Sequence, residues 1–490
     1  MSFRPLVAIV HYHLNSGGVT RVISQAVRSL EKSDVDCLIL AGSPCNFQIP
    51  KNAKSATIED LGYADGIHCS PINLEEQLNK TAITTFGREP DIWHFHNHSI
   101  GKNVPLSLAV RNLADKGRKI LLQIHDFPED RRPLNYSTLL KFTESASSEE
   151  LEQILYPQDS NIHYSVLNNR DFSYLLNSGF SSENLHLLLN PVSLGKVKKT
   201  NSINPFKGRN LWLYPSRCIR RKNIGEFILW ASLSDPKKNV FASTLKPTNQ
   251  EDIPPYERWQ ELCADKNLPV KFEIGLKYKN DLSEWFDSAH AVITTSVGEG
   301  FGLAFLEPFL FKRSVVGRDI KDITIDFKKT NIAFKSLYNA LRIPVSWIGE
   351  ETLLYHIESS MKHSYNLYNR NFESSIAQSA YHAAVSDGYA DFGRLNEELQ
   401  EKVITKILSR PELKKQISPN ILNPAEYGEN LLNDNYSLIQ HFFGLDTYKD
   451  TLMGIYSKML NSRITESEHN IKSTLLDQFL KPEDFYLLRS

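Results

Sequence analysis

The chain has 490 residues and a formal net charge of -1 at pH 7, and 41% of its residues are apolar, 10% aromatic and 23% charged. This composition is typical of a soluble globular protein, and the length favours two domains over a single core. The balanced charge excludes a general nucleic-acid-binding protein, because such proteins need a strong basic excess to neutralise phosphates.

The first apolar run, Leu6–Val10, is short and leads directly into polar His11, so it predicts a buried strand rather than a signal peptide. No stretch approaches the length of a membrane helix. The five cysteines are scattered without CxxC spacing, which favours reduced thiols over disulfides or zinc. We therefore expect a cytoplasmic enzyme, with peripheral membrane contact left open.

The first 200 residues alternate strand-like apolar runs with amphipathic helical runs. Such alternation predicts a parallel sheet covered by helices on both faces. The predicted strands are Leu6–His13, Asp36–Ala41, Asp91–His96, Lys119–His125, Ile162–Leu167 and Leu185–Leu189. The predicted helices between them include Val19–Leu30, Val104–Lys116 and Asp171–Ser178.

A polar stretch over residues 195–210 predicts a linker between domains. After it, the alternation of strand-like and helical runs starts again. From about Asp319 the strand signal fades and helical runs such as Asn396–Leu408 and Asp446–Leu460 dominate. We predict α/β domains over 1–200 and 201–435, the second with a helical insert, and closing helices over 436–490. The strands predicted in the second domain are Leu211–Pro215, Val240–Leu245, Val270–Gly275, Ala291–Thr295 and Ser314–Val316. Its predicted helices are Ile224–Leu233, Tyr256–Asp265, Leu282–Ser288 and Leu303–Phe311.

Polar residues and glycines follow the strand ends of the first domain, where ligands bind in open parallel sheets. Gly17 and Gly18 precede the first helix, and the pair predicts either close approach of a ligand to the backbone or an ordinary turn. His125 and Asp126 end the fourth predicted strand. An imidazole beside a carboxylate at this edge favours contact with a substrate, and a turn role for Asp126 is the alternative.

Alternate histidines end the third predicted strand, and two-residue periodicity places His94, His96 and His98 on one face. Three imidazoles on one face could bind zinc. No acidic or cysteine ligand lies nearby in the sequence, so packing and substrate contact are favoured and we predict no metal site.

In the second domain the first strand leads into a basic turn that contains Arg217, Arg220, Arg221 and Lys222 ahead of a helix. Arg217 and Lys222 are spaced to converge on one anion, and the helix dipole adds to their field. A solvated basic loop is the alternative. It is less favoured because the turn joins a buried strand to an amphipathic helix.

The strongest local signal is the glycine-rich turn from Gly298 to Gly302, which joins a strand to a helix. It presents Glu299 beside the backbone N–H groups of the next residues, and a sugar needs both acceptors and donors of this kind. Glu307, in the following helix, needs a polar partner if it is buried, and ribose hydroxyls would serve. The alternative is a tight turn with a solvated Glu299.

The segment Glu299-Gly-Phe-Gly-Leu-Ala-Phe-Leu-Glu307 resembles the E-x7-E signature of retaining glycosyltransferases of family 4, which have the GT-B fold. Arg217 through Lys222 resembles the Arg-x4-Lys pair of that family, and residues 16–21 resemble its N-terminal glycine loop. The segments 92–97 and 124–126 resemble its acceptor-side and donor-sugar strand ends. The segments 436–437 and 448–460 resemble its closing helices.

The resemblance implies two Rossmann-like domains facing across a cleft and transfer of a sugar from a nucleotide diphosphate to a hydroxyl, without a metal or other cofactor. It assigns the catalytic roles to Glu299 and His125. The residues it assigns to the donor are Gly17, Gly18, Arg217, Lys222, Gly300, Phe301, Gly302, Leu303 and Glu307, and those on the acceptor side are His96, Asn97 and Asp126.

Three departures from the family stand out. Gly317-Arg318-Asp319 replaces a Gly-Gly loop, the segment 319–435 is longer than the family core, and the tail after Asn461 has no counterpart. Two other functions stay open: a non-catalytic nucleotide-sugar-binding or scaffolding protein, and a sugar-nucleotide epimerase or phosphorylase on the same fold. UDP-glucose and GDP-mannose are both plausible donors. The acceptor, a saccharide, small molecule or lipid-linked group, is not identified by the sequence.

Overall fold

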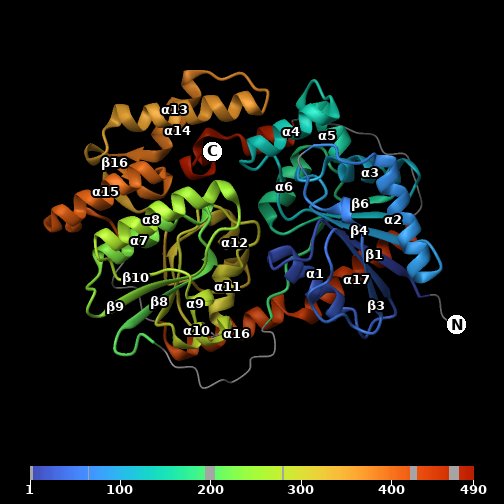
Figure 1. Cartoon of the computed structure of the whole chain (residues 1–490), viewed down its shortest axis with the longest axis horizontal. Helices are drawn as coiled ribbons and strands as arrows, with labels where there is room; N and C mark the ends of the chain where they lie inside the picture. Colours follow the sequence, from blue (N-terminus) through green and yellow to red (C-terminus); the bar gives the residue numbers. More distant parts are fainter. Residues whose placement is uncertain (1–3, 65, 194–204, 279–280, 420–426, 463–473) are drawn as a thin grey trace. The chain divides into compact units, whose positions relative to one another are not determined.

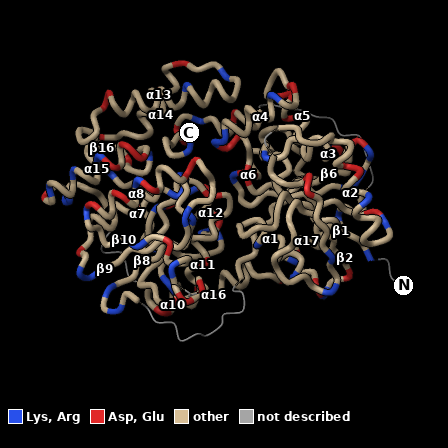
Figure 2. The backbone as a smooth tube through the Cα atoms, viewed as in Figure 1, with Lys and Arg blue, Asp and Glu red and all other residues tan. Residues whose placement is uncertain are grey.

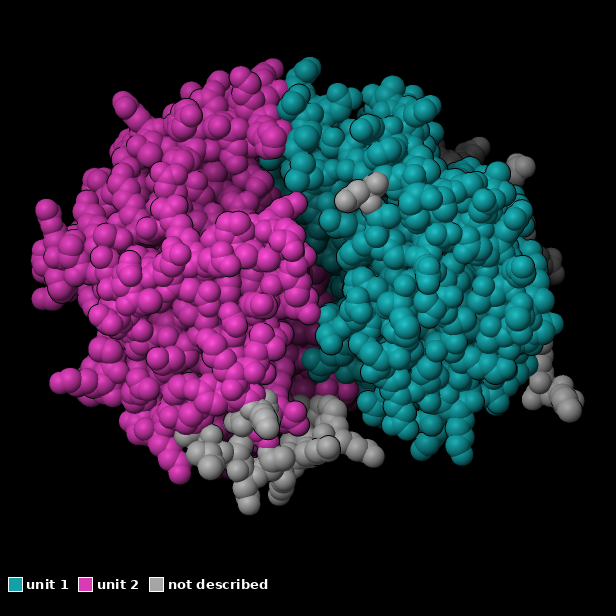
Figure 3. All heavy atoms as spheres, in the orientation of Figure 1, with its two compact units in different colours: residues 1–191, 364–371, 443–480 teal, residues 192–363, 372–442, 481–490 magenta. Residues whose placement is uncertain are grey.

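The computed structural model describes residues 4–64, 66–193, 205–278, 281–419, 427–462 and 474–490. The chain divides into two compact units, coloured separately in Figure 3. Unit 1 contains residues 1–191, 364–371 and 443–480, and unit 2 contains 192–363, 372–442 and 481–490. Most of the predicted linker, 195–204, lies outside the described residues.

Unit 1 is built on a seven-stranded parallel sheet with strand order β3-β2-β1-β4-β5-β6-β7. Every residue of β1, β4, β5 and β6 is buried, including the histidines of β4 and β6, as expected for strands covered on both faces. The strands are β1 (Leu6–His11), β2 (Asp36–Ala41), β3 (Ala53–Thr57), β4 (Ile92–His96), β5 (Ile120–Gln123), β6 (Ile162–Val166) and β7 (Leu185–Leu187). The helices are α1 (Gly18–Ser29), α2 (Pro71–Phe86), α3 (Val104–Asp115), α4 (Pro133–Thr143), α5 (Ser148–Leu155), α6 (Asn169–Asn177), α17 (Leu445–Asn461) and α18 (Leu475–Phe479).

Helix α17 comes from the distant end of the chain and completes the core of unit 1. Tyr448, Leu452, Ile455, Tyr456 and Met459 pack into one cluster with buried residues of β1, β2 and α1. Figure 1 shows this helix, in red, beside the blue strands of unit 1. The unit therefore depends on residues about 260 positions beyond its last strand (Leu187 to Leu445).

Unit 2 repeats the same topology with a six-stranded parallel sheet of order β10-β9-β8-β11-β12-β13. In both sheets the first strand lies between the second and the fourth, so the strand order reverses beside β1 and beside β8. The strands are β8 (Asn210–Arg217), β9 (Asn239–Leu245), β10 (Val270–Lys271), β11 (Ala291–Thr294), β12 (Val315–Arg318) and β13 (Ser336–Tyr338). The helices are α7 (Ile224–Leu233), α8 (Ile253–Asp265), α9 (Ile274–Lys277), α10 (Leu282–Ser288), α11 (Leu303–Leu310) and α12 (Lys321–Lys329).

Helices dominate the segment after residue 319, and it also contains short strands that were not predicted. Besides β13, it contains a three-stranded antiparallel sheet of order β14-β16-β15. These strands are only two or three residues long, too short to show a period in the sequence. They are β14 (Arg342–Pro344), β15 (Val385–Ser386) and β16 (Tyr389–Asp391), and the helices of this segment are α13 (Glu350–Leu367), α14 (Ser374–Ala384), α15 (Glu397–Ser409) and α16 (Glu429–Phe443).

Arg318, where the family has a glycine loop, ties this small sheet to the main sheet of unit 2. Its guanidinium is 1% exposed and lies 2.6 Å from Oε2 of Glu226 and 2.8 Å from Oδ1 of Asp391. Glu226 belongs to α7 and Asp391 to β16. The preceding Gly317 has φ 125°, and a Cβ atom there would lie 2.0 Å from the backbone oxygen of Thr294, so only glycine fits.

Two other local predictions are corrected. The strand predicted over 270–275 ends at Lys271, because Glu273 adopts the left-handed conformation with φ 62° and α9 begins at Ile274. Strand β3 was not predicted, since its only buried residue is Ala53 and its sequence is polar.

Charges of both signs are spread along the chain in Figure 2, in keeping with the near-zero net charge. The five cysteines are free. Across the described ranges, no helix is both long and apolar enough to cross a membrane.

Candidate functional site

The basic turn of unit 2 is a 3-10 turn, η2 (Arg220–Lys222), between β8 and α7. Side chains of the neighbouring strands hold its backbone. The hydroxyl of Tyr214 donates to the carbonyl of Lys222, and Oγ1 of Thr295 lies 3.0 Å from the same oxygen and 2.9 Å from that of Asn223. Asn223 has φ 54°, which turns the chain sharply into α7. The turn is therefore fixed at the carboxyl edge of the sheet.

Glu299 and Lys222, both predicted site residues, form a direct ion pair in this turn region. Their side chains are only 9% and 14% exposed. Nη1 of Arg221 lies 3.7 Å from Oε2 of Glu299 and donates to the carbonyl of Gly298 at 2.9 Å. Burial raises the pKa of Glu299, but Lys222 and Arg221 outweigh it, so the pKa lies below its ordinary value. Glu299 is therefore an ionised acceptor beside two cations.

The other two cations of the turn have different contacts. Arg217 donates to Oγ1 of Thr248 at 3.1 Å, and Arg220 pairs with Glu397 at 2.7 Å. Sequence reasoning selected Arg217 and passed over Arg221. The direction of each side chain depends on the 3-10 turn, which the sequence did not predict. The only feature of the sequence that could have indicated Arg221 as a site residue was its position next to Lys222.

The glycine turn reaches α11 through Gly302, which has φ 95°. A Cβ atom there would lie 2.8 Å from Cγ2 of Ile323, so glycine is required by both conformation and packing. Phe301 is buried, and Gly300 and Glu307 are half-buried. Leu303 begins α11, and Glu307 lies about one turn further along the same helix.

Four histidines gather at the carboxyl edge of the unit 1 sheet. Nδ1 of His96 lies 2.8 Å from Nε2 of His125, and Nδ1 of His11 lies 3.2 Å from the carbonyl of His96. His94 lies between Tyr456 Oη at 2.8 Å and Gln123 Oε1 at 3.0 Å. Burial lowers the pKa of His125 to about 4, although Asp126 raises it. These imidazoles are therefore neutral at pH 7 and act as hydrogen-bonding groups.

Only two of the three histidines of this strand share a face, so the predicted three-histidine face is wrong. The rings of His94 and His96 stack with centroids 4.5 Å apart, but Nε2 of His98 lies 2.7 Å from the carbonyl of Leu155. Asn97 has φ 56°, which ends the strand alternation after His96. A different group of side chains in the described ranges could share one metal ion. It consists of Asp60, His68 and Cys69.

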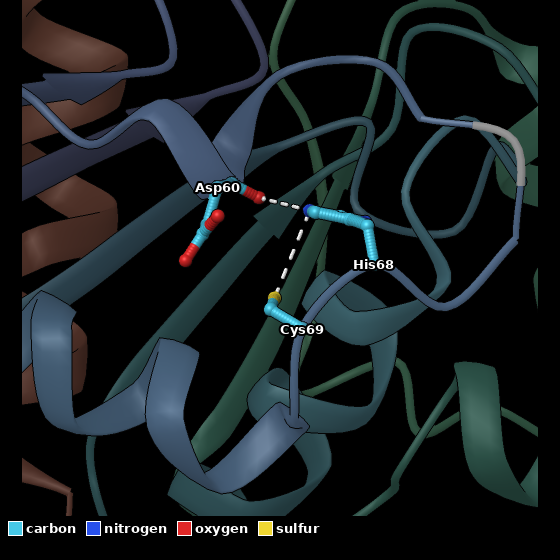
Figure 4. A group of neighbouring side chains, drawn as sticks. All are labelled: Asp60, His68 and Cys69. Atoms are coloured by element: carbon cyan, nitrogen blue, oxygen red, sulfur yellow. Dashed lines mark hydrogen bonds between the residues drawn. The ribbon is translucent and has the colours of Figure 1, made fainter.

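Figure 4 shows that group in unit 1. Nε2 of His68 lies 2.9 Å from the backbone oxygen of Asp60 and 3.7 Å from Sγ of Cys69. The Asp60 carboxylate accepts from Gln77 at 2.7 Å instead. Burial, with the charge of Asp60, raises the pKa of Cys69, which disfavours the thiolate that metals bind. Local hydrogen bonds therefore hold His68 beside the backbone of Asp60 and the thiol of Cys69.

Asn97 and Asp126 organise the loop after β5. Oδ1 of Asn97 accepts from the N–H of His125 at 2.7 Å and from that of Asp126 at 3.0 Å. The Asp126 carboxylate pairs with Arg132 at 2.6 Å. The residues predicted on the acceptor side, His96, Asn97 and Asp126, thus lie around His125 in one hydrogen-bonded group.

Gly17 and Gly18, at the start of α1, are exposed. A Cβ atom at Gly18 would meet nothing within 4 Å, and one at Gly17 would meet only the Asn15 oxygen at 3.8 Å. Neither position has positive φ that requires glycine, since Gly17 has the extended φ of -178°. The fold itself therefore does not demand glycine here, and the approach of a ligand to this backbone stays a prediction.

The buried histidines should make the protein less stable in acid. Burial lowers the pKa of His94 from 6.5 to about 3. Between these pH values the unfolded chain binds a proton that the folded state does not. The free energy of unfolding therefore decreases as the pH is lowered, by about 1.4 kcal/mol per pH unit for one such histidine. Buried Glu129 and Glu152 have pKa values raised to about 7 and 8, which act in the opposite direction.

The histidine contribution is isolated by comparing variants. Denaturant unfolding of His94→Gln between pH 7 and pH 4 should show a smaller loss of stability than the parent, and the exposed His382→Gln should match the parent. Equal losses in the parent and His94→Gln would show that His94 does not titrate as described.

Comparisons with known proteins bear on this arrangement. No protein-family model matches the chain. It is 26% identical over 513 positions to mannosylglucosyl-3-phosphoglycerate synthase of Petrotoga mobilis, covering 96% of this chain and 95% of that protein. Among solved structures it resembles sucrose-phosphate synthase of Thermosynechococcus elongatus, with a TM-score of 0.54, 13% identity and coverage of 93% and 99% of the two chains.

It also resembles HepE of Anabaena, solved with UDP and glucose, with a TM-score of 0.50, 11% identity and coverage of 92% and 99%. At these identities the solved structures establish the fold, which consists of two Rossmann-like domains. Together with the sequence relative, they support a glycosyltransferase of the GT-B fold.

Proposed function

We propose that the chain is a retaining glycosyltransferase of family-4 type that moves a sugar from a nucleotide diphosphate to a hydroxyl acceptor without a metal. The observation that carries this proposal is the pair of Lys222 and Glu299, with Arg221 beside it, at the carboxyl edge of the unit 2 sheet. Cations suit a diphosphate and an ionised carboxylate suits sugar hydroxyls, so the turn can hold both halves of a nucleotide sugar.

In unit 2, Arg221 and Lys222 neutralise the charge that develops on the leaving diphosphate as the bond to the anomeric carbon breaks. Arg217, which donates to Thr248 in this structure, joins them by turning away from that hydroxyl. The positive charges of the turn supply what a divalent metal would otherwise provide. Glu307 binds the nucleotide ribose. Glu299 and the backbone of Gly300, Phe301, Gly302 and Leu303 hold the sugar and the phosphates.

In unit 1, neutral His125 hydrogen-bonds the transferred sugar, and Gly17 and Gly18 allow the backbone to approach the phosphates. The acceptor binds on the side of His96, Asn97 and Asp126. The free cysteines support a cytoplasmic location.

The name of the Petrotoga relative suggests which substrates to try first. That protein is a synthase of mannosylglucosyl-3-phosphoglycerate. We therefore propose GDP-mannose as the first donor and a glucosylated phosphoglycerate as the first acceptor, with UDP-glucose as the alternative donor.

Transfer should proceed in EDTA at an undiminished rate, and the product should keep the anomeric configuration of the donor. Proton NMR of the anomeric signal during the reaction measures both rate and configuration. An inverted product, or activity that returns only when Mg²⁺ or Mn²⁺ is added, would contradict the proposal. Binding of nucleotide sugars without transfer or hydrolysis would favour the scaffolding alternative.

A further inference from the structure

The last ten residues of the chain, 481–490, fold back onto unit 2 as an ordered tail. Phe485, Leu487 and Leu488 are each only 3% exposed. Arg394 holds the tail from one side, donating to the carbonyls of Phe485 at 3.0 Å and Glu483 at 2.8 Å. The tail is therefore a packed part of the unit.

The tail is attached directly to the basic turn. Arg220, one of the cations of η2, donates to the backbone oxygens of Leu487 at 3.3 Å and Ser490 at 3.1 Å. The hydroxyl oxygens of Ser360 and Ser490 lie 2.5 Å apart. Arg220 thus serves to place the tail against the turn, which explains why it is not aimed at Glu299.

This placement brings Arg489 onto the glycine turn. A Cβ atom at Gly298 would lie 2.8 Å from Cζ of Arg489, 2.9 Å from Nε and 3.0 Å from Nη1. The guanidinium therefore occupies the space that any side chain at position 298 would need. Arg221 donates to the carbonyl of the same Gly298 at 2.9 Å. Arg221, Lys222 and Arg489 thus converge on the turn that carries Glu299.

We propose that Arg489 is a further ligand of the anionic group bound at this turn, and that the absence of a side chain at Gly298 admits its guanidinium. This rests on the proposed function, in which the anionic group is the diphosphate of the donor. A planar guanidinium can bind two phosphate oxygens at once, which a lysine cannot. Three cations at one turn match a diphosphate better than the Lys222–Glu299 pair alone.

Binding of GDP, UDP and inorganic pyrophosphate by titration calorimetry tests the proposal. Arg489→Gln should weaken binding of all three about tenfold or more, because a charge-assisted hydrogen bond is lost. Arg489→Lys should recover part of the lost affinity. Arg258→Gln removes the same charge from an exposed side chain of unit 2 and should bind as the parent does. Guanosine, which lacks phosphates, should not distinguish any of these variants.

A variant of the facing glycine gives an independent readout. Gly298→Ala should displace the flexible end of Arg489 and therefore weaken pyrophosphate binding when made in the parent. When made in the Arg489→Gln variant, it should weaken pyrophosphate binding little further. Unchanged melting temperatures would show that both variants keep the tail packed. Additive effects of the two changes would overturn the role assigned to Gly298.

The outcomes separate this proposal from the proposed function. If the parent transfers sugar and Arg489→Gln binds pyrophosphate as tightly as the parent, the role of Arg489 is overturned and the function stands. If binding depends on Arg489 but no sugar is transferred, the anion site stands and the function falls. If the parent binds no diphosphate, both are overturned.

Discussion

Replacing Lys222 with methionine should lower kcat/KM for sugar transfer by about 10²- to 10³-fold, while the protein stays folded. The loss has this size because a preorganised charge that stabilises the developing diphosphate is removed. Steady-state kinetics with the donor that the parent uses would measure it. Lys237→Met, which removes an exposed lysine of the same unit, is the matched control and should keep full activity.

The ion pair of Lys222 with Glu299 raises the alternative that the lysine only stabilises the fold. A double variant separates the two roles. Lys222→Met leaves a buried carboxylate without its first partner, and adding Glu299→Gln removes that charge and should restore the melting temperature. Activity should stay low in the double variant. Recovery of turnover together with stability would show that the pair is structural.

Replacing Arg318 with methionine should lower the free energy of unfolding of unit 2 by about 3–5 kcal/mol, because Glu226 and Asp391 are left as buried, uncompensated charges. Burial raises the pKa of Glu226 even in the presence of Arg318. Asn223 at 2.9 Å and Tyr338 at 2.6 Å also donate to this carboxylate, but both are neutral, so Arg318 is the cation that balances its charge. Denaturant unfolding should show an earlier transition for unit 2.

Arg258→Met supplies the contrast, because Arg258 is 60% exposed in its pair with Glu401 and its loss should cost less than about 1 kcal/mol. Combining Arg318→Met with Glu226→Gln should recover part of the lost stability. A loss in Arg318→Met no larger than that in Arg258→Met would contradict the anchoring role.

The sequence predicted the fold well where strands are long and continuously apolar. Strand β2 matched its predicted range, and so did helices α7 and α10. In the site, the approach of Lys222 to Glu299 followed from their places at the carboxyl ends of neighbouring strands, β8 and β11, because parallel strands bring these ends together.

The remaining features depend on information that local patterns do not carry. Arg217 was predicted beside Lys222, but the 3-10 turn directs Arg221 toward Glu299 and Arg217 toward Thr248. His98 left the expected face because one residue, Asn97, adopts a left-handed conformation. Arg489 could not be found at all, since its contact with Gly298 joins positions 191 residues apart through tertiary folding alone.

The division of the chain between the units also has a consequence for its synthesis. The cluster that contains β1, β2 and α1 is closed by α17, whose residues leave the ribosome only after nearly all of unit 2 has been made. The apolar face against which Tyr456 and Leu452 pack therefore stays exposed to solvent during most of translation. A nascent chain arrested before residue 445 should therefore bind chaperones, and release from them should follow once α17 has emerged.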